Sequence, residues 1–268
     1  DLNLPRYGLA NYVAPSSHEP PTPKEAKVLD DLSRAGKRLM GFCRTGLFTR
    51  LESSGQAFLQ SLERHVLRNY VFLHAIENGL DLPIGTQDAA YLDDRLFDED
   101  VDAVAGTTDL FDDEENDDGP AASNAGATPP RTEQDFKRRA AEVYDEYRKH
   151  YARRFRWLRP SLFDLALATD LRSDAQAVIK LLSKAGTWDA DRDAKLAALV
   201  ALLTKKHDRE KVLIFTQFAD TVQYLNAELK RRGVTDIAGV TGNASNPTAL
   251  AWRFSPVSNR KREQIAPT

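Results

Sequence analysis

Residues 211–215 read Lys-Val-Leu-Ile-Phe, an unbroken run of β-favouring apolar residues behind one lysine. The run is too short for a helix and suits a strand that is covered on both faces of a sheet. A helical pattern over 193–206 precedes it and another over 222–229 follows, and Gly233 ends the second helix. Residues 234–240 then predict a second strand. This order of helices and strands indicates an α/β unit built around a parallel sheet.

A sheet of this kind usually has about five or six strands, and only two are recognisable before Thr268. We therefore expect 186–268 to be the N-terminal part of an incomplete α/β lobe. The chain also begins at Asp1 without an initiator methionine. It is therefore expected to be a piece of a longer protein.

The region 1–92 predicts an extended lead-in followed by a helical hairpin. Thr22-Pro23-Lys24-Glu25 is typical of a helix start, with threonine at the cap and proline at the first position. Apolar stripes over 28–40 and 47–73 then predict two packed helices, the second ending near Gly79. The lead-in is expected to be extended because five prolines interrupt it: Pro5, Pro15, Pro20, Pro21 and Pro23.

The region 93–131 is predicted to be an acidic flexible linker. Between Asp93 and Asp118 there are thirteen Asp and Glu residues against Arg95 alone, a net charge of −12. Small residues without a period follow, so like-charge repulsion and the lack of buriable side chains favour a solvated segment. An acidic mimic of nucleic acid is the alternative. Because the whole chain carries −3, the remainder carries +9, and the folded parts are basic.

The region 132–185 is predicted to be helical and to contain a basic helix. The helical period runs from Glu133 to Leu158 and resumes over 162–182. Residues 136–159 hold nine Lys and Arg against three acidic residues, with aromatic residues interleaved. Such a helix could neutralise phosphates, with these as candidate contacts: Arg153, Arg154 and Arg156. Alternatively, the aromatic residues pack inward and the charges are only solvated.

Composition and motifs exclude several classes of protein. The single Cys43 rules out an internal disulfide framework and fits a reducing compartment, so a cytoplasmic protein is expected. No apolar run approaches the roughly 18–20 residues of a membrane span. The five histidines show no zinc-ligand spacing. Thr216-Gln217-Phe218 follows the first strand in place of a glycine-rich turn, which disfavours a dinucleotide-binding oxidoreductase.

Two further ligand-binding motifs are absent or incomplete in the sequence. No Gly-x₄-Gly-Lys-Ser/Thr sequence is present, so the chain lacks a phosphate-binding loop of that type. The triplet Asp189-x-Asp191-x-Asp193 is similar to the start of a calcium loop, but it lacks the later glycine and glutamate. We therefore expect Asp191 or Asp193 to cap a helix.

Two stretches, 193–199 and 210–221, are similar to the entry of a second RecA-like lobe. The second stretch contains Lys-Val-Leu-Ile-Phe-Thr-Gln-Phe, which is similar to motif IV of such a lobe. Residues 47–54, followed by Ala57-Phe58, resemble an element between the two lobes. Together these stretches resemble bacterial Swi/Snf-like (RapA-like) superfamily-two helicases. The resemblance covers most of the chain loosely and 193–254 best.

This resemblance implies ATP-dependent translocation along duplex DNA, with ATP and magnesium held between two motor lobes. The matching positions on the nucleic-acid side are Thr216 and Gln217 in motif IV, and Thr241 and Gly242 in the loop after the second strand. An exposed loop at the end of a strand suits contacts with phosphates. Alternatively, Thr216 caps a helix and Gly242 supplies a turn.

The sequence departs from the family in its catalytic parts. The phosphate-binding loop, the Asp-Glu box and the arginines of the last motifs are all missing, and phosphoryl transfer needs such groups. We therefore expect the parent protein to be the ATPase, with DNA and the remaining motor lobes as partners. The fragment is expected to be inactive, with no catalytic residue, metal or bound cofactor of its own. The alternative function is a non-enzymatic helical interaction module that binds nucleic acid or a protein.

Overall fold

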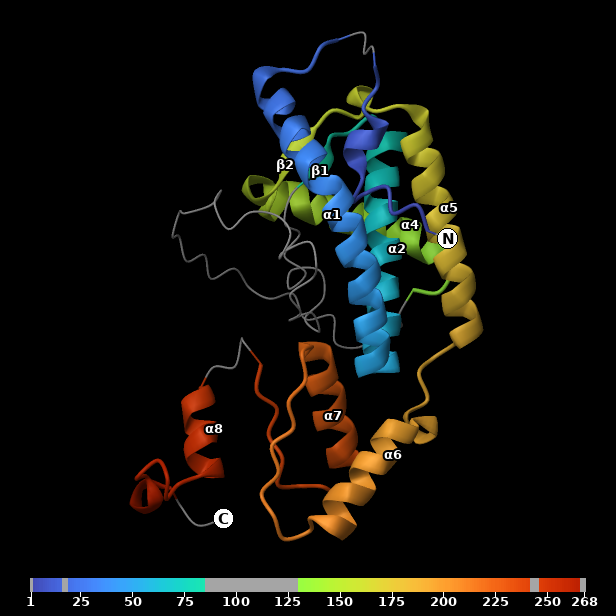
Figure 1. Cartoon of the computed structure of the whole chain (residues 1–268). Coiled ribbons are helices and arrows are strands. Elements are labelled where there is room, and N and C mark those ends of the chain that lie inside the picture. Colours follow the sequence, from blue (N-terminus) through green and yellow to red (C-terminus); the bar gives the residue numbers. More distant parts are fainter. Residues whose placement is uncertain (1, 16–18, 85–129, 242–245, 266–268) are drawn as a thin grey trace. The chain divides into compact units, whose positions relative to one another are not determined.

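The computed structural model describes residues 2–15, 19–84, 130–241 and 246–265 (Figure 1). These residues are mostly helical, with one small two-stranded antiparallel sheet. They divide into two compact units, a first unit up to Thr187 and a second unit from Trp188 onward. No helix in the described part of the chain combines the length and apolar character needed to cross a membrane.

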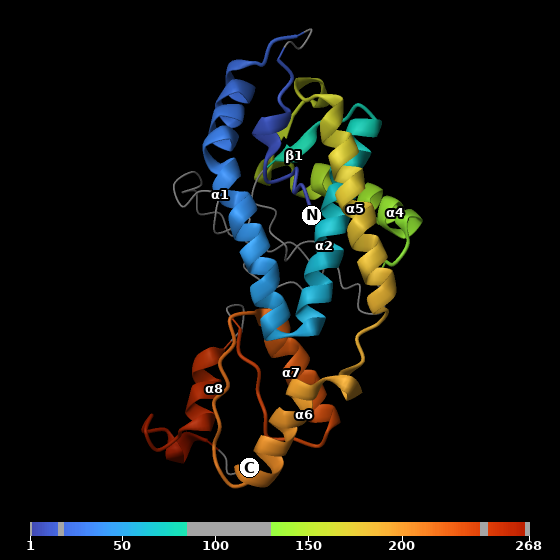
Figure 2. The ribbon, with the colours of Figure 1, turned by 45° about the vertical axis from the view of Figure 1, so that its right-hand side comes forward.

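The first unit is built around one central helix. Helix α2, Gly55–Glu77, contacts α1 (Pro23–Ser53), α4 (Glu133–His150) and α5 (Leu165–Ala185) (Figures 1 and 2). Because three helices cover it, its buried apolar residues are spread around most of its circumference. They are Ala57, Leu59, Leu62, Val66, Tyr70, Val71, Phe72, Leu73 and Ala75.

Helix α1 starts as the sequence predicts. The Thr22 hydroxyl accepts a hydrogen bond from the backbone N–H of Glu25 at 3.3 Å, and the Glu25 carboxylate accepts one from Thr22 N–H at 2.7 Å. This reciprocal capping box satisfies two N–H groups that a helix start leaves without partners. Pro23 occupies the first helical position, as expected.

The break between the first two helices lies later than predicted. Helix α1 continues through the expected interruption to Ser53, and Ser54 alone separates it from α2. Ser54 turns the chain by adopting an extended backbone, and its hydroxyl accepts a hydrogen bond from Ala57 N–H. The hairpin is therefore present, but Phe48 and Leu51 lie on α1 and are 68% and 47% exposed.

The basic helix also ends earlier than predicted. Helix α4 stops at His150, and 156–158 form strand β2, paired antiparallel with β1 (Leu82–Ile84). The chain turns back because its aromatic rings pack on the helix it has just left. The Phe155 ring lies 4.4 Å from that of Tyr147, and the Trp157 ring lies 5.9 Å from that of Tyr144.

The lead-in is not simply extended. It contains a 3₁₀ helix, Leu9–Tyr12 (η1), and Leu4, which is buried and has a left-handed backbone (φ 52°). The carboxylate of Asp174 on α5 accepts hydrogen bonds from Asn3 N–H at 2.9 Å and Leu4 N–H at 2.7 Å. These contacts fix the segment on the first unit. The predicted linker 93–131 lies outside the described residues, except for Pro130 and Arg131.

The second unit holds its helices around a small core. It contains α6 (Ala194–Ala201) with a π-helical turn after it (η6, Leu202–Lys206), α7 (Ala219–Arg231) and α8 (Pro247–Phe254). Two short 3₁₀ helices lie outside these, Ala190–Arg192 (η5) and Arg262–Gln264 (η7). The core cluster consists of Leu196 on α6 with Tyr224 and Leu229 on α7.

The expected parallel sheet is not formed in the described residues of the second unit. Residues 211–215 and 234–240 are both irregular, since a strand exists only where a neighbour takes up its backbone hydrogen bonds. The segment 234–240 packs on α7 instead. A Cβ added at Gly239 would lie only 2.9 Å from a methyl carbon of Val222.

Ion pairs of Arg159 connect the start of α1 and the residues before it to the chain after β2. The Arg159 guanidinium donates to both carboxylate oxygens of Glu25, from Nε at 2.8 Å and from Nη2 at 2.9 Å. It also donates to Glu19 at 2.5 Å and to the Pro20 carbonyl at 3.1 Å. The Arg159 hydrogen bonds lower the pKa of Glu25 from 4.5 to about 2, against the opposing effect of its burial.

Replacing Glu25 should therefore destabilise the first unit in a pH-dependent way. The substitution Glu25→Gln keeps a side chain suited to the capping box but removes the charge, and should lower the free energy of unfolding at pH 7 by about 2 kcal/mol. Because the folded pKa is depressed, the difference from wild type should shrink as the pH falls through 4.5 towards about 2. Urea unfolding followed by circular dichroism between pH 7 and pH 2 measures it.

The control for this prediction is Glu77→Gln on α2. Glu77 accepts a hydrogen bond from Arg172 at 2.6 Å, but the side chains of this pair are 45% and 41% exposed. Exposed pairs contribute only about 0–1 kcal/mol, so this variant should stay close to wild type. Equal losses for the two variants, or a Glu25→Gln effect that persists at pH 2, would contradict the prediction.

Candidate functional site

The motif IV residues lie at the entrance of α7. Thr216 is half-buried, and its hydroxyl accepts a hydrogen bond from Phe218 N–H at 3.4 Å. Phe218 is the cap residue of α7 and has no side-chain cap of its own. Thr216 therefore shapes the turn before the cap without being the cap, and Gln217 beside it is exposed.

The second predicted pair is described only in part. Thr241 is half-buried and follows the segment that packs on α7, whereas Gly242 lies outside the described residues. The turn expected at Gly242 therefore stays a prediction.

The three candidate arginines do not share a helix face. Arg153 and Arg154 lie in a 3₁₀ helix, Ala152–Arg154 (η3), and the Arg153 side chain is exposed. Arg156 lies in β2 and donates to the Asp31 carboxylate on α1 at 2.9 Å. The side chains of this pair are 27% and 34% exposed. Arg156 therefore connects β2 to α1, and Arg153 is the better placed of the two to reach a phosphate.

The charges of α4 are largely balanced within the helix. Four cations form ion pairs with carboxylates three or four residues away: Lys137–Glu133, Arg138–Asp135, Arg139–Glu142 and Lys149–Asp145. The Arg148 guanidinium lies 4.6 Å from the centre of the Trp157 ring. Tyr144 and Tyr147 are buried. This arrangement fits the interpretation of inward-packed aromatics and solvated charges.

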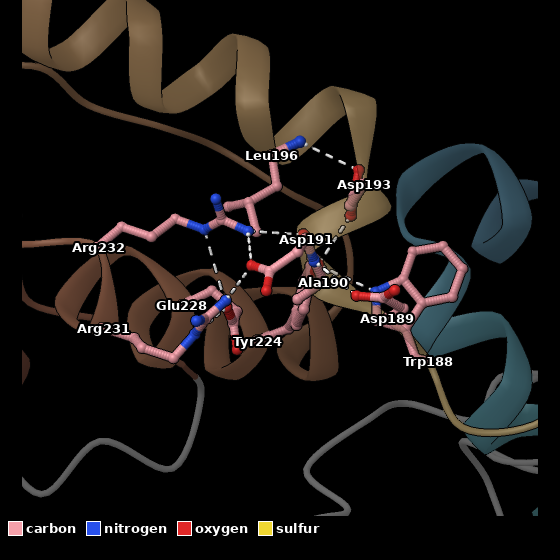
Figure 3. A network of polar contacts seen from close by, with 10 residues as sticks. All are labelled: Trp188, Asp189, Ala190, Asp191, Asp193, Leu196, Tyr224, Glu228, Arg231 and Arg232. Atoms are coloured by element: carbon pink, nitrogen blue, oxygen red, sulfur yellow. Dashed lines mark hydrogen bonds and ion pairs between the residues drawn. The ribbon is translucent and has the colours of Figure 1, made fainter.

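In the second unit, a network of polar contacts fastens η5 and α6 to α7 (Figure 3). The Asp193 carboxylate caps α6 by accepting from the N–H groups of Lys195 at 2.9 Å and Leu196 at 3.1 Å. It also accepts from the Tyr224 hydroxyl at 2.8 Å, and that hydroxyl accepts from the Trp188 indole N–H at 3.0 Å. The expected helix cap is therefore confirmed at Asp193.

Asp191 has a different role in the same network. Its carboxylate accepts from Arg231 at 2.6 Å and from Arg232 at 2.9 Å, and Arg231 also donates to Glu228 at 2.9 Å (Figure 3). The Arg231 hydrogen bond lowers the pKa of Asp191. Burial is the main cause that raises the pKa of Tyr224 to about 12, so its hydroxyl stays a donor at neutral pH. The carboxylates of this network therefore hold η5 and α6 against α7.

A group of buried basic residues in the first unit was not predicted from the sequence. Arg50 on α1 and Arg64, His65 and Arg68 on α2 are each buried and line one cavity. The apolar pattern over 47–73 predicts which apolar residues are buried and does not place these basic residues. One feature of the sequence could have indicated their burial. The apolar residues of α2 are spread around most of the helix, and a helix that is covered on most sides also buries the charged residues that lie between them. Within the described ranges, no group of three or more His, Cys, Asp or Glu residues is placed to hold a metal ion.

The network in Figure 3 predicts that Tyr224→Phe destabilises the second unit. The change removes the hydroxyl that links Trp188 to Asp193, and a lost hydrogen bond to a charged group costs about 1.5–3 kcal/mol. Tryptophan fluorescence during urea unfolding should show a lower midpoint and a changed Trp188 environment.

The matched control is Tyr12→Phe in the first unit. The Tyr12 hydroxyl donates to Asp170 at 2.7 Å, so the same hydroxyl-to-carboxylate contact is removed in the other unit. This control should leave the second-unit transition in place. A Tyr224→Phe protein with an unshifted second-unit transition would show that the network does not stabilise the unit.

Comparisons with protein-family models, with curated proteins and with solved structures find no match to this chain. A function for the chain therefore has to be inferred from its residues and their geometry.

Proposed function

We propose that the chain is part of an ATP-dependent DNA translocase of the Swi/Snf-like branch. The first unit would supply helices between the two motor lobes, and the second unit the first part of the second RecA-like lobe. The resemblance of 193–199 and 210–221 to that lobe supports the assignment. The structural observation that carries it is the exposure of the apolar run 211–215.

Three neighbouring side chains of this run are solvent-exposed, Leu213 by 63%, Ile214 by 43% and Phe215 by 89%. In an extended chain, successive side chains point to opposite faces, so Leu213 and Phe215 would share one face and Ile214 the other. Both faces of the run therefore have apolar groups to bury. This is the pattern of an interior strand in a parallel sheet with helices on both sides. A purely helical interaction module has no need for such a segment.

The surroundings of the run fit the same proposal. Helix α6 precedes it and α7 follows it, and the two helices share the core of Leu196, Tyr224 and Leu229. The next segment, 234–240, lies against α7, where Gly239 permits close approach to Val222. Helix α7 thus connects two segments in the way that a crossover helix connects two parallel strands.

The described residues do not by themselves fit ATP and magnesium. They hold no cluster of metal-ligating groups, and the sequence has no glycine-rich phosphate loop. The proposal therefore assigns ATP and magnesium to the parent protein and places duplex DNA near Thr216 and Gln217, at the end of the run. The remaining motor lobes are the partners that would cover 211–215.

The chain alone should show no ATPase activity stimulated by DNA. Missing even one group that stabilises charge in phosphoryl transfer typically lowers the rate by about 10³-fold or more. The test measures phosphate release with and without duplex DNA, for residues 1–268 and for a longer product of the same gene at equal concentration. The longer product should be active, and its coding sequence should contain Gln-x₂-Gly-Arg-x₂-Arg after Thr268. Stimulated turnover by residues 1–268 alone would contradict the proposal.

Duplex DNA binding should depend on Arg153 more than on Arg156. Arg153→Ala should weaken binding to unrelated sequences alike and reduce the slope of log affinity against log salt by about 0.9, the value for one phosphate contact. Arg156→Ala should instead lower stability, since it breaks the pair with Asp31.

Fluorescence anisotropy over a salt series measures the slope, and Arg172→Ala is the control. Arg172 is an arginine of the first unit that pairs with Glu77 on α2, and its side chain is 41% exposed. A slope for Arg153→Ala that equals those of wild type and the control would exclude Arg153 from the DNA interface.

A further inference from the structure

Helix α1 leaves an apolar patch exposed on its outer side. The helix lies on the outside of the first unit, and its inner face packs on α2 and on the N-terminal segment, the latter through Cys43 and Leu47 (Figure 2). Away from that inner face, Phe48 is 68% exposed and Leu51 is 47% exposed. These two residues lie one turn apart and form a continuous patch, whereas a single exposed apolar residue would need no explanation.

Two residues of opposite charge flank this patch at equal spacing. Arg44 lies four residues before Phe48 and Glu52 lies four residues after it, and both are exposed. Four residues of an α-helix correspond to about 6 Å along the axis and a rotation of roughly 40°, so both charges share the face of Phe48. This face therefore carries a positive group at one end, a negative group at the other and an aromatic ring at its centre.

The order of these groups is complementary to itself when a second copy of the helix runs antiparallel. A two-fold axis that relates the two Phe48 residues places Arg44 of each copy opposite the partner's Glu52, at both ends of the contact. A parallel arrangement about the same centre would place Arg44 beside the partner's Arg44 and Glu52 beside the partner's Glu52, which is repulsive. The charge pattern therefore favours one occupant, a second copy of this chain, in one orientation.

Both charged groups have the capacity for an additional partner. The Arg44 guanidinium donates from one Nη atom to the Leu2 carbonyl at 3.2 Å, and a guanidinium has five N–H donors in all. A carboxylate has about four acceptor positions, so Glu52 can keep its contact within its own chain and still accept from the partner's Arg44. The contact between copies therefore adds hydrogen bonds without breaking those of the single chain.

We propose that α1 is a self-association surface, on which a second copy of this chain binds antiparallel about Phe48. The two Phe48 rings contact each other at the centre, Leu51 packs on the aliphatic stem of the partner's Arg44, and the two ion pairs set the register. One pair of helix faces buries a smaller area than the roughly 1,200–2,000 Å² of a stable interface, so the dimer is expected to be weak and reversible. This inference does not rest on the proposed motor function, because it uses only the first unit.

The first experiment tests the apolar centre of the contact. Sedimentation velocity of residues 1–268 over a concentration series should show a reversible equilibrium between monomer and dimer. Phe48→Asp should abolish the dimer, because a charge replaces the ring at its centre. The matched control is Phe215→Asp in the second unit, where the side chain is 89% exposed, and this variant should dimerise like wild type. Dimers that persist in Phe48→Asp, or that are lost in Phe215→Asp, would overturn the proposal.

Exchange of the two charges tests the antiparallel orientation. Arg44→Glu alone sets like charges opposite each other at both ends of the contact, and so does Glu52→Arg alone. Each variant should therefore dimerise about ten-fold more weakly than wild type. A mixture of the two variants should form mixed dimers with the affinity of wild type, because opposite charges again face each other at both ends. An effect of either substitution on folding alone would persist in the mixture, so this recovery reports contact between copies.

The control for the charge variants is Arg34→Glu on the same helix. Arg34 is 73% exposed, pairs with Asp30 and lies ten residues before Arg44, outside the proposed contact, so this variant should dimerise like wild type. A fluorescent label on one of the two mixed variants measures the mixed dimer directly. A wild-type chain that stays monomeric over the whole series, single charge variants that dimerise like wild type, or a mixture that associates no better than its components would each overturn the proposal.

Discussion

The first unit depends on the enclosure of α2 by three other helices. A helix covered on three sides has to bury polar groups together with apolar ones, and each buried polar group requires a partner. Asn69, fully buried on α2, donates to the Leu171 carbonyl of α5 at 3.3 Å and accepts from Arg6 at 3.1 Å. A polar residue of the central helix thereby positions both α5 and the N-terminal segment.

The second unit is stabilised by polar contacts around a much smaller core. Its core cluster has three buried residues, and the contacts of Asp191 and Asp193 with α7 surround it. This arrangement holds α6 and α7 together but leaves the apolar run 211–215 uncovered. The unit thus pairs the charged groups of this network while a run of three apolar side chains stays exposed, a feature typical of a surface that meets another element or partner.

Local signals allowed much of the fold to be predicted from the sequence. The capping box at Thr22, the cap at Asp193 and the end of α7 before Gly233 depend only on nearby residues. Features that need distant partners were missed or misplaced. Strand β2 forms because β1 and the rings of α4 lie beside it, and the pairing of Arg156 follows from that position. Likewise, apolar periodicity marks buried faces but does not show which arginines share them.

The positive charge of the folded parts is not uniform in its effect. On α4, carboxylates three or four residues away balance most of the lysines and arginines, and water and salt screen the rest. The side chains of Arg50, Arg64 and Arg68 are buried, where electrostatic interactions are several times stronger and each charged group requires a partner. A count of basic residues along the sequence therefore does not show which charges matter for binding or stability, because burial and pairing decide the strength of each one.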